Sequence, residues 1–307
     1  MWREEFYMRK RARSLSLILC LAMFATVAYG CGLTDAEDKK DIVTSNKDYE
    51  NTSENQENKA DITIEEKVLF EQDGIVVTAK EYVTDDIWGD GIKLLIENNS
   101  DKSITVGCNA LIVNNYMISD LFVSGVAAGK SANKIMYLSN TELEAAGIDT
   151  VGQIEAYFHV YDSDTYETLF DTDCVTIRTS EYANMDIVAD DTGVELYNAN
   201  GVKIIGKTVD ENSFWGTAIL LYCENHSGQN IGISVEEMSI NGFMIEPLFT
   251  TTIYDGKMAL EDITIFTEDL VVNGINEIEE VELKFHIYDA ESYDAIADKE
   301  FVTFYAQ

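Results

Sequence analysis

The chain has 307 residues, with 21 Lys and Arg against 56 Asp and Glu, and a formal net charge of -35. This charge argues against nucleic-acid binding, which relies on Lys and Arg to displace counterions from phosphates, and it disfavours adsorption to anionic lipid headgroups. Hydrophobic residues make up 46% of the chain, as in globular proteins and unlike disordered acidic chains. The length suggests two domains of ordinary size with additional segments.

The first 30 residues predict a signal peptide. Residues 9–13 carry four basic side chains, residues 15–27 are apolar and uncharged, and residues 28–30 end in small Gly30. The apolar run is too short for a comfortable membrane span, which needs about 20 residues. We therefore expect residues 1–30 to be removed on export.

Cys31 follows Gly30 directly, and this junction resembles a bacterial lipoprotein signal. The resemblance implies that Cys31 becomes the first mature residue and carries acyl chains, which anchor the protein at the extracellular face of the cytoplasmic membrane. The match departs from the family at Ala28, where Leu is usual, and at the bulky Tyr29. The alternative is an ordinary secreted protein cut after Gly30, with Cys31 unmodified.

Residues 31–62 predict a disordered acidic linker. Positions 32–62 contain nine acidic and four basic residues, and polar runs such as residues 51–56 bury nothing. Such a segment does not offset its ordering entropy. Behind a lipid anchor it is expected to hold the folded part roughly 30 Å from the membrane.

The rest of the chain is an internal duplication. A shift of 127 positions aligns residues 74–177 with residues 201–304 without a gap, and 30 of the 104 pairs are identical. The matches include Trp88-Gly89 with Trp215-Gly216, Glu97-Asn98-x-Ser100 with Glu224-Asn225-x-Ser227, and Phe158-His159-Val160-Tyr161-Asp162 with Phe285-His286-Ile287-Tyr288-Asp289. We predict two copies of one domain, at residues 63–180 and 181–307.

Each copy is expected to be β-structure. Residues 154–161 and 281–288 alternate with period two, and turn clusters separate other stretches rich in Val, Ile, Thr and aromatic residues. Residues 141–147 and 267–274 each begin with Thr and acidic residues and end in Gly, which predicts one short helix per copy. The fold class that follows is all-β, with two tandem immunoglobulin-like antiparallel β-sandwich domains. The further strands are expected at residues 75–82, 92–97, 104–113, 121–126 and 174–178.

The two copies together resemble a repeat module of secreted lipoproteins from Gram-positive gut anaerobes. The shared pattern runs Gly-Ile, Trp-Gly, Leu-x-Ile-Glu-Asn-x-Ser and Phe-His-Ile-Tyr-Asp, and it covers residues 66–305. These motifs are structural, and the resemblance implies an exported location and the fold but no activity.

Three cysteines remain in the two copies. Cys108, Cys174 and Cys223 align with Val, Phe and Ile of the other copy, which predicts that they act as small buried apolar residues. Their spacing forms no zinc site. A bridge between Cys108 and Cys174 stays open if their strands are neighbours.

His159 and His286 occupy the same place in the two copies, two residues before Tyr161 and Tyr288. One interpretation is a metal ligand or general base, with Asp162 or Asp289 nearby. We favour the other, an outer-face histidine packed among cross-strand tyrosines, because no second ligand lies at metal spacing.

Trp88 and Trp215 are the remaining binding candidates. A tryptophan beside a flexible Gly suits stacking on a sugar or anchoring a partner. The apolar residue before each one instead favours a plug at the end of the sandwich.

The sequence predicts no catalysis. It has no nucleophile elbow, no phosphate-binding Gly loop and no His-Glu-x-x-His motif. The acidic turns at residues 162–164 and 171–173 fit solvated charged turns better than calcium sites. We expect no cofactor and no bound metal.

The function predicted is that of a membrane-tethered extracellular lipoprotein. It acts as a non-catalytic binding or cell-envelope interaction module whose partner is an envelope or extracellular protein or glycan. The alternative is a solute- or glycan-binding lipoprotein with its site at the tryptophans.

Overall fold

Strands form where apolar residues alternate with polar ones. In β8 (Gln153–Asp162) every second side chain is buried, from Ile154 to Asp162. In β18 (Glu280–Asp289) the alternation runs from buried Val281 to buried Ile287. Both stretches therefore place one face on a core and the other toward solvent, as their sequence predicts.

The computed structural model describes residues 62–85, 89–119, 121–185, 187, 189–213, 216–297 and 301–305, with the backbone alone at 211–213. The signal peptide, Cys31 and almost all of the linker lie outside these residues. Within them, no helix is long and apolar enough to cross a membrane.

The first repeat forms two facing sheets. One has the order β1-β2-β3-β7, and the other runs β10-β8-β4-β5, with β6 paired to β4 and β9 paired to β8. The bounds are β1 (Lys67–Gln72), β2 (Ile75–Asp85), β3 (Gly89–Asn98), β4 (Ile104–Val113), β5 (Tyr116–Ile118), β6 (Val123–Val126), β7 (Lys130–Tyr137), β8 (Gln153–Asp162), β9 (Thr168–Asp171) and β10 (Val175–Arg178).

The second repeat has the same succession of strands. One sheet has the order β11-β12-β13-β17, and the other runs β15-β14-β18-β19, with β16 paired to β14. The bounds are β11 (Val194–Ala199), β12 (Val202–Ser213), β13 (Gly216–Asn225), β14 (Ile231–Ile240), β15 (Phe243–Ile245), β16 (Thr250–Ile253), β17 (Lys257–Phe266), β18 (Glu280–Asp289) and β19 (Phe301–Tyr305).

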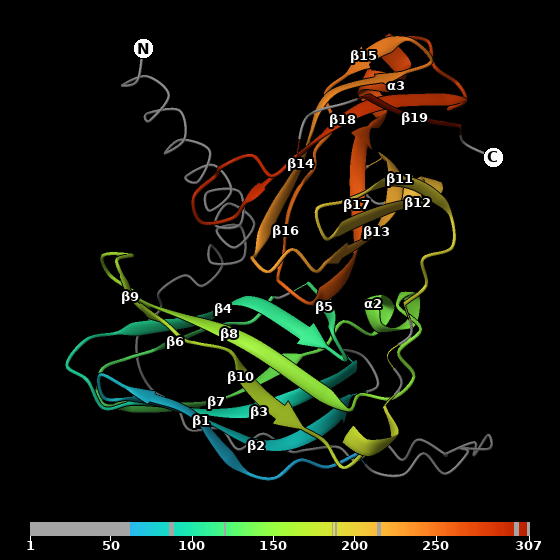
Figure 1. Ribbon diagram of the computed structural model, residues 1–307. Helices are drawn as coiled ribbons and strands as arrows, with labels where there is room; N and C mark the ends of the chain where they lie inside the picture. Colours follow the sequence, from blue (N-terminus) through green and yellow to red (C-terminus); the bar gives the residue numbers. More distant parts are fainter. Residues whose placement is uncertain are drawn as a thin grey trace, which may run out of the picture. The chain divides into compact units, whose positions relative to one another are not determined.

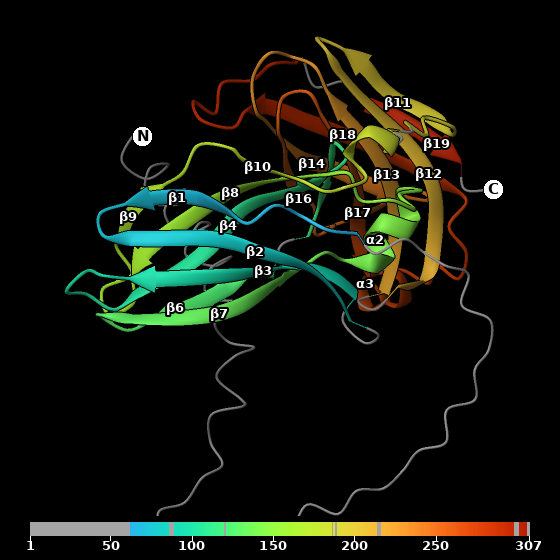
Figure 2. The same ribbon diagram turned by 90° about the horizontal axis from the view of Figure 1, so that it is seen from below.

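The strand order is immunoglobulin-like in both repeats. In the first, β2-β3-β7 take the places of strands A, B and E, and β10-β8-β4 take those of G, F and C. These two groups face each other in both views (Figure 1, Figure 2). The predicted all-β class, with two tandem antiparallel sandwiches, is confirmed.

One short helix interrupts each repeat at equivalent places, α2 (Asn140–Ala145) and α3 (Thr267–Val272). Gly147 and Gly274 follow the helix ends with φ of 68° and 69°, a left-handed conformation that glycine adopts without strain. The helices are confirmed, but the predicted Thr cap is wrong. Ser139 and Phe266 stand at the cap positions, and neither makes a side-chain cap hydrogen bond.

Each sandwich has its own apolar core, and each core contains a buried asparagine at the same place in the repeat. Asn98 and Asn225 are 1% and 0% exposed. In each, the side-chain amide donates to two backbone carbonyls and the side-chain oxygen accepts from a serine two positions later. The repeated Asn-x-Ser motif therefore stabilises a turn through buried hydrogen bonds.

The two repeats share one sheet. β5 of the first repeat pairs in parallel with β17 of the second, through Tyr116 with Met258 and Met117 with Ala259. This pairing makes a ten-stranded sheet that crosses from one repeat into the other, within the compact unit of residues 59–307.

Candidate functional site

The predicted tryptophan sites lie outside the described residues. Trp88 and Trp215 fall in gaps at residues 86–88 and 214–215. Neither the sugar-stacking nor the plug interpretation is tested by the structure, so both remain predictions.

His159 lies in an aromatic stack on the outer face of β8. Its ring is 5.5 Å from that of Tyr161, and the Tyr161 ring is 6.3 Å from Tyr166 with the planes 25° apart. The Nδ1 atom of His159 lies 2.6 Å from Oδ1 of Asp171. The structure thus brings His159 and Tyr161 together, but with Asp171 rather than Asp162.

The second repeat builds the same stack on β18. The His286 ring is 4.9 Å from Tyr288, which lies 5.8 Å from Tyr293 with the planes 20° apart. Nδ1 of His286 lies 3.2 Å from Oε1 of Glu236. Tyr166 and Tyr293 were not predicted, although their identity across the duplication is visible in the sequence.

The outer tyrosine of each stack has a strained backbone. Tyr166 and Tyr293 have φ of 60° and 63°, in a region that a non-glycine residue occupies at a cost of about 1–3 kcal/mol. Tight turns hold them there. Oδ1 of Asp162 accepts two backbone N–H groups, as does Oδ1 of Asp289.

The same hydrogen bonds lower the pKa values of the Asp162 and Asp289 carboxyls. Both carboxylates are therefore committed to their turns and do not face the histidines. His159 and His286 instead lie beside Asp171 and Glu236, and their interpretation as a general base stays a prediction. Among the described residues no group of three or more His, Cys, Asp and Glu is placed to hold a metal ion.

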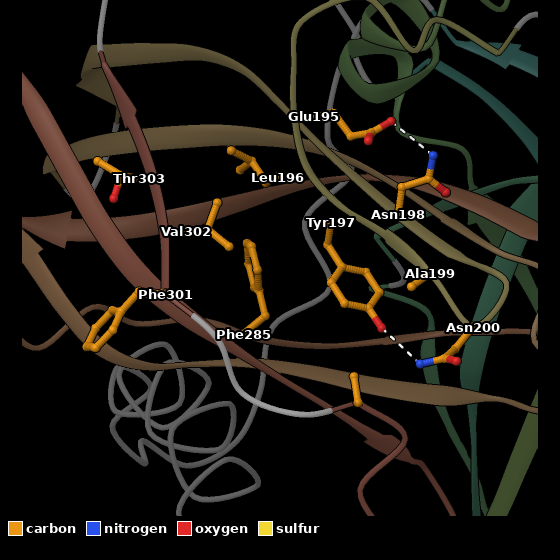
Figure 3. Close-up of a pocket in the computed structure, with 11 residues that line it drawn as sticks. Glu195, Leu196, Tyr197, Asn198, Ala199, Asn200, Phe285, Phe301, Val302 and Thr303 are labelled. Carbon is orange, nitrogen blue, oxygen red and sulfur yellow. Dashed lines mark hydrogen bonds between the residues drawn. The ribbon is translucent and has the colours of Figure 1, made fainter.

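A hollow of about 610 Å³ opens at the edge of the second repeat, between β11 and β19 (Figure 3). The rings of Tyr197 and Phe285 face the same space from β11 and β18, while Phe301 lies apart from them. The Nδ2 atom of Asn200 donates to the Tyr197 hydroxyl at 3.2 Å and holds that ring. The lining is completed by Glu195, Leu196, Asn198, Ala199, Ala297, Val302 and Thr303.

A second hollow of about 320 Å³ lies along the same edge. It is lined by β11, β12, β13 and β19 residues, among them Val194, Val209 and Phe304. The two hollows between β11 and β19 are called the edge groove below.

The first repeat fills the corresponding space with aromatic side chains. There Phe70 packs 5.4 Å from Phe158 and 5.9 Å from Phe170, ring centre to ring centre. The shift of 127 positions places Tyr197, Phe285 and Ala297 at these three sites. The larger hollow therefore lies where a phenyl ring in one copy is replaced by a methyl group in the other.

Backbone contacts also join the two edges of the first repeat. Ile64 bridges to Thr179, and the N–H of Ser180 donates to the carbonyl of Thr63 at 2.8 Å. The counterparts of Thr179 and Ser180 in the second repeat, residues 306 and 307, lie outside the described residues. Nothing in the sequence of the second repeat alone marks this groove, but the mismatch of Phe170 with Ala297 does.

The junction of the repeats contains a half-buried ion pair. Nζ of Lys257 lies 2.5 Å from Oε2 of Glu155 and 3.3 Å from Oδ1 of Asn115, and both charged side chains are 13% exposed. The rings of Tyr157 and Tyr254 pack beside it with centres 4.6 Å apart. The pair joins β8 of one repeat to β17 of the other.

Glu261, on β17, lines a cleft of about 640 Å³ between the repeats. Burial raises its pKa from 4.5 to about 7, helped by Glu142 and Asp262 and opposed by a 2.8 Å hydrogen bond from Thr251. A raised carboxyl pKa destabilises the folded state as pH rises. The penalty is absent below pH 4.5, grows between pH 4.5 and 7, and is complete above that range.

Glu261→Gln is therefore expected to raise the free energy of unfolding at pH 8 by about 2–3 kcal/mol and to leave it unchanged at pH 4. The glutamine oxygen retains the hydrogen bond from Thr251. Urea unfolding at the two pH values measures this, with exposed Glu268→Gln as the matched control. Equal stabilisation at both pH values would contradict a titrating Glu261.

The cysteines differ from one another in their surroundings. Cys223 is buried, which raises the pKa of its thiol well above the usual value. Cys174 is exposed, so the prediction of a buried apolar role is wrong for it, and Cys108 is half-buried. The structure contains no Cys108–Cys174 bridge.

The sequence matches no family model and no curated protein. Among solved structures, the YadV chaperone has a TM-score of 0.24 at 12% identity and covers 75% of this chain and 100% of its own. The SafA pilin in complex with the SafB chaperone from Salmonella enterica has a TM-score of 0.21 at 9% identity, covering 70% of this chain and 88% of its own.

A protein of unknown function from Porphyromonas gingivalis W83 has a TM-score of 0.20 at 10% identity, and the match covers 71% of this chain and 90% of its own. TM-scores this low do not establish a common fold. The immunoglobulin-like assignment stands on the strand order of the sheets themselves.

Proposed function

We propose that this protein is a non-catalytic binding module, held outside the cell by a lipid on Cys31, that binds a protein partner at the edge groove of its second repeat. The observation that carries the proposal is the groove itself, a hollow with both aromatic and polar lining groups at a place that the first repeat fills with Phe170.

The edge strands favour a protein ligand. β11 pairs only with β12, and β19 pairs only with β18, among the strands that the structure describes. Edge strands present unpaired N–H and C=O groups to any extended chain that lies beside them. A groove between two such strands offers backbone hydrogen bonds together with apolar contact.

The side chains of the groove suit binding rather than chemistry. The described residues that line the larger hollow carry aromatic, aliphatic, amide and hydroxyl groups and one carboxylate, that of Glu195. Glu195 accepts a hydrogen bond from Asn198 at 2.9 Å. No nucleophile stands beside a base in this described set. These groups support the proposal of a binding role.

A site-specific photo-crosslinker tests the binding role. The probe is placed at Thr303, exposed on β19, or at Thr176, its identical counterpart on β10 of the first repeat. Cells displaying the full-length chain are irradiated, and covalent adducts are identified. We expect a defined protein adduct at position 303 and none at 176. No adduct at 303, or equal adducts at both positions, would overturn the proposal.

The tether is tested separately. Cys31→Ala removes the thiol that acyl chains require, so the protein is expected to move from the membrane fraction to the medium. Immunoblots of both fractions measure this, with Cys174→Ala as a control that leaves partitioning unchanged. Unchanged partitioning of Cys31→Ala would contradict lipidation, and the protein would then be secreted.

A second candidate function, glycan binding, is favoured by the two His-Tyr-Tyr stacks. Tyr166 and Tyr293 are 61% and 43% exposed, and exposed tyrosine faces suit the apolar faces of sugar rings. Tyr166→Ala combined with Tyr293→Ala is expected to abolish retention on cell-wall glycan, whereas Tyr182→Ala is not. Unaltered retention of the double variant, or no retention of the wild type, would exclude this candidate.

A further inference from the structure

The edge groove has the form of a site for an extended segment. Its two hollows follow β11 and β19 rather than forming one closed cavity. The six residues of β11 span about 20 Å at roughly 3.3 Å per residue. In an extended segment, alternate side chains lie on one face about 7 Å apart, so two of them are able to enter the two hollows.

The first repeat shows which side chain fits the larger hollow. In that repeat Phe170 is buried against Phe70 and Phe158. The second repeat keeps two of these aromatic positions, as Tyr197 and Phe285, and loses the third at Ala297. A phenyl ring supplied from outside would restore the three-ring cluster, with tilted and edge-to-face contacts that favour aromatic pairs.

The negative charge of the second repeat indicates the charge of the segment that would bind there. Residues 181–307 contain 25 Asp and Glu but only 5 Lys and no Arg. Lys207, which lines the smaller hollow, is already paired with Asp190 at 2.8 Å. A segment with Lys or Arg is attracted to this surface, whereas the chain's own acidic residues 32–62 are repelled by it.

We propose that the edge groove binds an extended, basic segment of a partner protein and receives one of its aromatic side chains in the hollow left by Ala297. This inference rests on the proposed function and names its partner's chemistry. The aromatic side chain packs between Tyr197 and Phe285, and the backbone of the segment lies along β11 or β19.

Peptide binding tests the proposal directly. The probe is a blocked, fluorescein-labelled hexapeptide, Lys-Thr-Phe-Thr-Val-Lys, titrated by anisotropy against the full mature chain carrying Cys31→Ala. We expect replacement of Phe by Ala in the peptide to weaken binding at least tenfold, because a buried phenyl ring is lost. Replacement of both Lys by Glu is expected to weaken it at least tenfold as well.

Two variants of the protein test whether the peptide binds at the edge groove. Ala297→Phe rebuilds the cluster of the first repeat, and it is expected to abolish peptide binding while the melting temperature stays equal or rises. Ala297→Leu fills the same hollow with a smaller group, should the phenyl ring fail to pack. Phe170→Ala, at the matched position of the first repeat, is expected to leave binding to the second repeat intact.

The outcomes separate this inference from the proposed function. Equal affinity for the Phe and Ala peptides, equal affinity for the Lys and Glu peptides, or full binding by both folded Ala297 variants overturns the inference. If Thr303 still yields a protein adduct, the proposed function stands with a partner of other chemistry. Loss of both results removes both proposals.

Discussion

Asn225→Ala is expected to lower the free energy of unfolding by about 3 kcal/mol or more. The Nδ2 atom of Asn225 donates to the carbonyls of Gln229 and Ile253, each at 2.8 Å. Its Oδ1 atom accepts from the N–H and hydroxyl of Ser227 at 2.9 and 2.7 Å. Alanine leaves these groups without their partner inside the core, and each buried unsatisfied group costs about 1–3 kcal/mol.

Urea unfolding of the full mature chain measures this loss. Ser227→Ala, which removes one hydroxyl at the partly exposed end of the network, is the milder control, with an expected loss of about 1 kcal/mol. Asn98→Ala tests the equivalent hydrogen bonds in the first repeat. A loss below 1 kcal/mol for Asn225→Ala would show that the asparagine does not hold the turn.

Lys257→Ala is expected to cost about 3–5 kcal/mol and to separate the unfolding of the two repeats. Removal of one partner leaves the Glu155 carboxylate half-buried without its cation, which is far more costly than the net value of the pair. The loss falls at the contact between β8 and β17, where the repeats depend on each other.

Lys130→Ala is the matched control for Lys257→Ala. Lys130 occupies the equivalent position of the first repeat, at the start of β7, and it is exposed there. Its replacement is expected to change the stability by less than about 0.5 kcal/mol. Calorimetry of the wild type should show one transition and that of Lys257→Ala two. Equal effects of the two substitutions would contradict a special role for the junction.

The strands were predictable where one face is strongly apolar. The stretch at residues 104–113 coincides with β4, and the alternation at residues 154–161 lies within β8. The duplication then gave each strand a second test, since a stretch whose apolar alternation is weak in one copy has a clearer counterpart in the other. At these strands the local apolar pattern agrees with the pairing seen in the sheets, so the sequence was sufficient to predict them.

Edge and seam strands were not predictable in the same way. β1 has only three apolar residues in six and the first half of β7 is mostly polar, and the burial of both is low. They are strands because a neighbour pairs with them, not because of their own pattern. The parallel contact of β5 with β17 joins residues about 140 positions apart, and no local signal marks it.

The candidate site was predictable only in part. The sequence predicted His159 and His286 among cross-strand tyrosines, whereas Tyr161 and Tyr288 stack on them from the same strand. It also did not show Tyr166 or Tyr293 completing the stacks. The edge groove depends on the absence of a ring at Ala297. An alanine carries no functional signal by itself, and its meaning emerges only against Phe170.

The seam between β5 and β17 has a consequence for the two copies. The seam pairs unlike strands of the two copies, so equivalent positions have different surroundings. Lys257 is confined while its twin Lys130 is exposed to solvent. The two copies are therefore not equivalent at this seam, although they share one fold.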